Sequence, residues 1–120
     1  MVLVDTSIWV DHFRRSSRQL PELLRQGVVL SHSFVIGELA CGHLKDRAEI
    51  LFLLSKLPPA RSAAHHEVLA FIEQRKIMGS GIGYVDAHVL AAAALSRASV
   101  WTRDTKLKKV AVRLGLGYES

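Results

Sequence analysis

Three short, largely apolar runs with β-branched residues most constrain the fold of this 120-residue chain. They lie at residues 1–5, Val28–Leu30 and Ser99–Thr102, and each is too short to be a buried helix. The segments between them carry helical patterns. Strands that alternate with helices or helix pairs are typical of a parallel sheet covered by helices. The chain is therefore predicted to be an α/β protein with a single domain over residues 1–120.

Capping residues, prolines and glycines set the bounds of the predicted helices. The candidate caps are Thr6 or Ser7 for a helix that ends near Arg15, and Ser31 or Ser33 for the helix that carries Glu38. The other predicted helices span residues 19–26, 46–56, 63–76, 84–98 and 105–114. A glycine-rich loop at residues 79–83 lacks the spacing of a dinucleotide-binding motif and is interpreted as a hinge.

Four acids stand in surroundings where a charge is costly, namely Asp5, Glu38, Asp86 and Asp104. Asp5 and Asp104 follow the first and third apolar runs, and Asp86 lies near the start of a helix. In open α/β sheets, ligands bind beyond the carboxyl ends of the strands, so these three acids are expected to meet at one edge. Glu38 and Asp86 have apolar or small residues three and four positions away, which predicts that both face inward.

A shared divalent cation is the simplest partner for these four carboxylates, because clustered carboxylates repel one another. Oxygen ligands favour hard ions, so Mg²⁺ or Mn²⁺ is expected rather than zinc. Such an ion would favour attack on a phosphodiester. Thr6 and Thr102 adjoin or lie near the acids, and their hydroxyls either support the carboxylates or only bond the backbone. Glu67 also has apolar neighbours, but it lies in the first turn of a helix and is interpreted as structural.

The formal net charge is +5 and the sequence pI is about 9.8, which suits a polyanion-binding protein but does not identify one. Basic residues are concentrated in the last quarter of the chain, around Asp104. They are Arg97, Arg103, Lys106, Lys108, Lys109 and Arg113. This cluster is either a solvated helix face or a phosphate-binding surface, and its nearness to the acids favours the second interpretation.

Histidine and cysteine do not indicate a second metal site. His65 and His66 are adjacent and would point about 100° apart on a helix. His88 is expected to face away from Asp86. The single cysteine, Cys41, is interpreted as a small buried thiol, and it excludes an intrachain disulfide.

Two further features concern location and partners. No signal peptide and no membrane-spanning stretch is recognisable, so a cytoplasmic location without membrane association is expected. Four apolar side chains fall on amphipathic helices, and they either pack in the core or line a groove for a partner helix. They are Trp9, Phe13, Phe52 and Leu54.

Four motifs together resemble the PIN-domain ribonucleases, and within them the VapC toxins of bacterial and archaeal toxin–antitoxin pairs. They are Val2-Leu3-Val4-Asp5-Thr6-Ser7, Glu38, the segment 83–94 that begins Gly83-Tyr84-Val85-Asp86, and Thr102-Arg103-Asp104. The resemblance covers essentially the whole chain. It implies a PIN-like three-layer α/β/α sandwich with a central parallel sheet.

The resemblance also implies an activity, which is Mg²⁺- or Mn²⁺-dependent endonucleolytic cleavage of RNA, with transfer RNA or ribosomal RNA as the usual targets. It assigns Asp5, Glu38, Asp86 and Asp104 as the catalytic, metal-binding acids, with Thr6 and Thr102 as supporting residues. It further implies a homodimer and inhibition by a cognate antitoxin, whose helical tail lies in a groove near the acids. The alternatives are an RNA- or protein-binding module with an idle site, and an RNA-processing nuclease without a toxin role.

Overall fold

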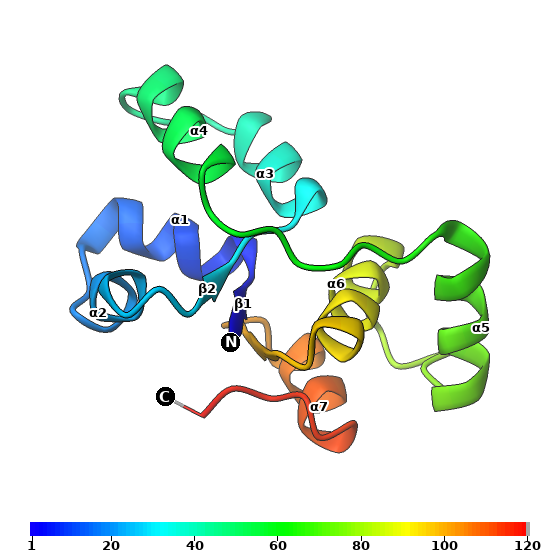
Figure 1. The fold of residues 1–120 in the computed structure, drawn as a ribbon. Helices are drawn as coiled ribbons and strands as arrows, with labels where there is room; N and C mark the ends of the chain where they lie inside the picture. The colour runs from blue at the N-terminus through cyan, green and yellow to red at the C-terminus, as the bar shows by residue number, and fades with distance from the viewer. Residues whose placement is uncertain (120) are drawn as a thin grey trace.

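The computed structural model describes residues 1–119, in which three strands and seven helices are found (Figure 1). They are β1 (Val2–Val4), α1 (Thr6–Arg15), α2 (Gln19–Arg25), β2 (Val29–Leu30), α3 (Ser33–Ala40), α4 (Arg47–Ser55), α5 (His65–Arg75), α6 (Tyr84–Ser96), β3 (Ser99–Trp101) and α7 (Thr105–Arg113). Every predicted element is present, and the ends differ from the predicted bounds by at most two residues.

The three strands form a parallel sheet in the order β2-β1-β3. Val2 pairs with Val29 on one side and with Ser99 on the other, so the carboxyl ends of all three strands reach the same edge. The central strand is fully enclosed, with Leu3 and Val4 both 0% exposed. Residues that follow β1 and β3 are therefore placed side by side, and the backbone N–H of Asp5 donates to the carbonyl of Trp101 at 2.9 Å.

Helices cover both faces of the sheet, which confirms the predicted α/β sandwich. Figure 1 shows α1 and α2 on one side of the strands, and α6 and α7 on the other. Helices α3 and α4 pack against each other, and α5 packs on the outside of α6. Among the helices of residues 1–119, none has the length and apolar character needed to cross a membrane.

Two short pairings that the sequence did not predict extend the sheet at its outer edges. Ser31 bridges to Pro59 beside β2, and Val100 bridges to Gly117 beside β3. Both bridges are parallel. The segments after α4 and α7 thereby occupy hydrogen-bonding groups that the two edge strands would otherwise expose.

Two helix caps differ from the prediction. Asp5, not Thr6 or Ser7, occupies the N-cap position of α1. His32, not Ser31 or Ser33, caps α3, and its ring Nδ1 accepts the backbone N–H of Phe34 at 3.0 Å. The hydroxyls of Thr6 and Ser7 are not used as caps because both are bonded to carboxylates.

Candidate active site

Asp5 is the buried centre of a hydroxyl network at the carboxyl edge of the sheet. Its side chain is 7% exposed, and its Oδ2 accepts the hydroxyl of Thr102 at 2.7 Å and that of Ser7 at 3.0 Å. Each hydroxyl also accepts a backbone N–H at 3.0 Å, Ser7 from Arg103 and Thr102 from Asp104. The two hydroxyl oxygens are also 3.2 Å apart, and the network ties the end of β1 to the segment after β3.

Glu38 lies on α3 and is exposed, so the prediction that it faces inward is wrong. Helix α3 packs on the core through Val35 and Leu39, which are 1% and 2% exposed. Of the four neighbours that suggested burial, only Val35 is buried; Phe34, Cys41 and Gly42 are exposed. The carboxylate is nevertheless held at the sheet edge, because the Thr6 hydroxyl donates to Glu38 Oε1 at 2.7 Å.

Asp86 is half-buried in the first turn of α6, and its Oδ2 accepts a long hydrogen bond of 3.4 Å from the backbone N–H of Gly83. Burial raises the pKa of the Asp86 carboxyl, and the Gly83 hydrogen bond partly opposes this. The negative charges of Asp5, Asp104 and Glu38 raise the same pKa further. All three carboxylates therefore lie close enough to Asp86 for their charges to act on it.

Asp104 lies on the exposed surface at the start of α7, and the prediction that it stands in a costly apolar setting is wrong. It is the N-cap of α7, and its Oδ1 accepts the backbone N–H of Leu107 at 2.9 Å. This bond fixes the carboxylate just beyond the end of β3. Only Asp5 of the four acids is fully buried, and Asp86 is intermediate.

The four acids share one pattern of hydrogen bonding. One oxygen of each is held by a protein donor, and the other has no hydrogen-bond donor among residues 1–119. The held oxygens are Asp5 Oδ2, Glu38 Oε1, Asp86 Oδ2 and Asp104 Oδ1. Within the described chain, the only buried side-chain polar atom without a partner is Nε2 of His32. The free oxygens of Asp5 and Asp86 are therefore accessible to solvent.

The donor set suits a hard cation in charge and atom type, but it does not form a closed cage. In residues 1–119, no three Asp, Glu, His or Cys side chains are placed to hold one ion directly. Mg²⁺ usually keeps several waters and is bound through one or two carboxylates, so a site of this kind does not need three direct protein ligands. The structure thus fits a cation held partly through water, not one ion touched by all four acids.

Comparison with known proteins identifies the family. Residues 2–113 match the family described as PIN domain. The chain belongs to the PIN-domain family. It is 41% identical over 117 residues to "Ribonuclease VapC32" of Mycobacterium tuberculosis, in strains CDC 1551 / Oshkosh and ATCC 25618 / H37Rv, which covers 97% of this chain and 94% of the relative. Together these matches make it a PIN-domain ribonuclease of the VapC type.

A solved structure supports the same fold. The protein in "Crystal structure of PAE2754 from Pyrobaculum aerophilum" superposes with a TM-score of 0.61 over 95% of this chain and 88% of that chain. The two sequences are 18% identical, so this likeness concerns the fold alone.

The basic residues of this PIN domain are spread more widely than predicted. Arg97 precedes β3 and so lies at the amino edge of the sheet, opposite Asp104. Arg113 donates to carbonyls at the end of α5. Arg103 pairs with Asp11 at 2.6 Å, and the Lys106 side chain lies against the Gly81 backbone. Of the predicted cluster, Arg103 is thus paired with an acid of α1 outside the candidate site, and Lys106 lies against the loop before α6.

Two other side chains were missed or misjudged by the sequence interpretation, and a third was interpreted correctly. Ser7 belongs to the Asp5 network, a role signalled only by its position two residues after the strand-end acid. Cys41 is exposed at the end of α3, not buried. Glu67 is structural as predicted, because its carboxylate accepts the backbone N–H of Ala64 at the start of α5.

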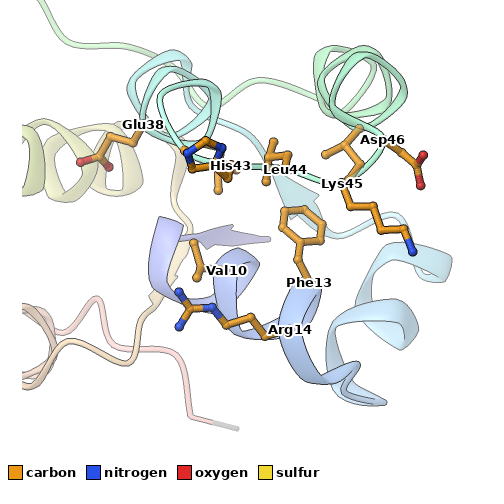
Figure 2. A pocket seen from close by; sticks show the side chains of 11 residues that line it. Val10, Phe13, Arg14, Glu38, His43, Leu44, Lys45 and Asp46 are labelled. Carbon is orange, nitrogen blue, oxygen red and sulfur yellow. The ribbon is translucent and has the colours of Figure 1, made fainter.

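A groove of about 440 Å³ lies between α1, α3 and α4, with Glu38 on its rim. Figure 2 shows Phe13 pointing toward Leu44 inside the groove, while the Glu38 carboxylate points away from Lys45 and Asp46. Of the four side chains considered for core or groove, Trp9 and Leu54 are buried, whereas Phe13 and Phe52 are 38% and 59% exposed. The PIN domain therefore has a groove, lined by both apolar and charged side chains, that reaches one of its candidate catalytic acids.

Proposed function

We propose that this chain is a single-domain, Mg²⁺- or Mn²⁺-dependent endoribonuclease that acts in the cytoplasm as the toxin of a toxin–antitoxin pair. Its targets are transfer or ribosomal RNA. The observation that carries the proposal is the set of four acids at the carboxyl edge of the sheet, each with one oxygen held and one free. The likeness to a VapC ribonuclease supports the substrate class.

The proposed catalytic and metal-binding residues are Asp5, Glu38, Asp86 and Asp104. A bound Mg²⁺ or Mn²⁺ would supply a polarised water and stabilise the charge that develops on the phosphodiester. The four carboxylates hold negative charge at one place. Burial and then the charges of the other three acids raise the Asp86 pKa, and a bound cation would offset both effects. Thr6 and Thr102 orient Glu38 and Asp5 through their hydroxyls, as supporting groups around a metal site do.

Metal titration tests this function directly. Purified protein should cleave transfer or ribosomal RNA only when Mg²⁺ or Mn²⁺ is present, and EDTA should abolish cleavage reversibly. The melting temperature should also rise with millimolar Mn²⁺, because an ion that binds only the folded state stabilises it. Undiminished cleavage in EDTA would contradict the metal-dependent mechanism. Absence of Mn²⁺ binding together with absence of cleavage would instead favour an RNA- or protein-binding module.

The toxin role is tested in cells. Induced expression of this chain alone should arrest growth, and sequencing of RNA ends after induction should locate the cleaved target. The same induction with the Asp5→Asn variant is the matched control. Normal growth despite detectable RNA cleavage would favour an RNA-processing nuclease.

The antitoxin is proposed to bind the groove between α1, α3 and α4, as a helical segment whose apolar side chains contact Phe13 and Leu44. A basic side chain on that segment would reach Glu38 at the rim. The free toxin is proposed to be a homodimer, which light scattering can test. These partner proposals rest on the family resemblance together with the shape and lining of the groove.

The hydroxyl of Thr102 is expected to matter more for RNA cleavage than the volume of its side chain does. Thr102→Val keeps the shape but removes the donor to Asp5 and the acceptor for the Asp104 N–H, so cleavage should fall roughly 10- to 100-fold. Thr102→Ser keeps the hydroxyl and should retain most of the activity. Comparable rates for the valine and serine variants, measured on one RNA, would show that the hydroxyl has no supporting role.

A further inference from the structure

A cluster of aromatic rings lies beside the acidic site and is not used by the proposed catalytic residues. Its centre is His88, which is 5% exposed on α6. Phe34 of α3 and Tyr84 of α6 each pack edge-to-face against His88, with ring centroids 4.6 Å apart in both pairs. His32 lies beneath, 2% exposed and 5.3 Å from the Phe34 ring. The cluster thus joins α3 to α6 around a buried imidazole.

The two outer rings of this cluster remain open to solvent. Phe34 is 39% exposed and Tyr84 is 41% exposed, although each is also fixed by its contact with His88. Tyr84 is further restrained by a hydrogen bond between its hydroxyl and Nδ1 of His65. Rings that are both exposed and held in place lose little conformational entropy when another flat group stacks on them.

The position of these rings relates them to the acids. Phe34 lies one helical turn before Glu38 on the same face of α3, a separation of about 5–6 Å between β carbons. Tyr84 opens α6 and belongs to the same surface as Phe34 because both rings pack on His88. The loop that precedes α6 carries Gly81, and the Lys106 side chain of α7 rests against it. A cationic side chain therefore lies beside the loop that leads into Tyr84.

We infer that Phe34 and Tyr84 form a stacking subsite for an unpaired nucleobase of the RNA, next to the phosphodiester that is cut. This inference rests on the proposed ribonuclease function. Sequence-specific proteins commonly hold single-stranded RNA by stacking splayed bases on aromatic rings. Lys106 would contact a phosphate of the same strand. The subsite favours substrates in which a base near the cleavage point is unpaired, as in a loop.

The test measures RNA binding in the Asp5→Asn background, where cleavage does not interfere. Phe34→Leu and Tyr84→Leu keep an apolar side chain but remove the flat ring, and Tyr84→Phe keeps the ring. Each protein is titrated by fluorescence anisotropy with a short single-stranded oligoribonucleotide and with an abasic strand of the same length. The leucine variants should bind the normal strand roughly 5- to 100-fold more weakly, since one stacked base contributes on that scale. Their affinity for the abasic strand should be unchanged.

Two control variants show whether the flat rings beside the acids are themselves responsible for the affinity. Tyr84→Phe keeps the ring but loses the hydrogen bond to His65, and it should bind the normal strand more tightly than Tyr84→Leu does. Phe52→Leu alters an exposed ring on α4 and should bind like the parent. Equal weakening on both strands, or no weakening on either, would overturn the inference. A change in oligomeric state by light scattering, with the affinity loss, would assign the rings to a second copy and also overturn it. If the unmodified protein cleaves no RNA in the presence of Mg²⁺, the proposed function itself fails. If it cleaves RNA and only the stacking effect is absent, the stacking inference fails and the proposed function stands.

Discussion

Asp5→Asn is expected to reduce RNA cleavage at least about a thousand-fold while leaving the fold intact. The substitution replaces a buried carboxylate by an amide of nearly the same shape, so the hydroxyls of Thr102 and Ser7 can still donate to the remaining oxygen. It removes the negative charge that would bind the cation, and loss of several kcal/mol of transition-state stabilisation corresponds to such a factor. Initial rates on one RNA in Mg²⁺, with melting temperatures for both proteins, measure the effect.

The matched control is Asp46→Asn, an identical chemical change on the surface. Asp46 has a left-handed backbone with φ of 55°, which asparagine tolerates, and it makes no capping hydrogen bond. This variant should cleave RNA like the unmodified protein. A fully active Asp5→Asn protein, purified free of other nucleases, would defeat the assignment of the acidic site.

The site residues that follow the ends of strands were predicted well from the sequence. A short apolar run followed by an acid places that acid at the carboxyl edge of a parallel sheet. Asp5 lies there because β1 ends at Val4, and Thr102 because β3 ends at Trp101. The geometry follows from local chain direction and needs no knowledge of side-chain packing.

Apolar neighbours were a poorer guide, both three and four positions from Glu38 on its helix and directly beside Cys41 in the sequence. Apolar residues three and four positions away do not tell whether their face of the helix meets the core or the solvent. In α3 the core face is that of Val35 and Leu39, and Phe34 is left exposed. Proximity between basic residues and Asp104 along the chain was equally misleading for Arg97, because β3 separates them and carries them to opposite edges of the sheet.

Contacts between residues far apart in sequence were not predictable. His32 and His88 are isolated in the sequence, but β2 and α6 bring their rings to 6.4 Å, and burial lowers the pKa of both imidazoles. Gly117 pairs with Val100, although the sequence around Gly117 shows no strand pattern. Such features depend on how the finished layers meet, which periodicity within one segment does not encode.

Asp86→Asn is expected to abolish cleavage and, in the absence of metal, to stabilise the protein. Burial and then the charges of Asp5, Asp104 and Glu38 raise the pKa of Asp86 in the folded state. The ionised carboxylate therefore opposes folding at neutral pH. Removing its charge should raise the free energy of unfolding by up to about 1 kcal/mol, since Asp86 is only half-buried and solvent screens part of the repulsion. The melting temperature should rise by roughly 2–6 °C.

The pH dependence of this stabilisation distinguishes it from a generic effect of the substitution. Because the folded-state pKa of Asp86 is raised, the folded protein takes up a proton before the unfolded chain does, and the unmodified protein gains stability as the pH falls through the folded pKa. The extra stability of the Asp86→Asn variant should be fully present above the folded-state pKa of Asp86. It should vanish below the pKa that Asp86 has in the unfolded chain. Saturating Mg²⁺ should reverse the order at neutral pH, because the cation stabilises the carboxylate form. Urea unfolding at several pH values, with EDTA or Mg²⁺, measures both trends. A variant less stable than the unmodified protein in EDTA at neutral pH would refute the destabilising effect of the Asp86 charge.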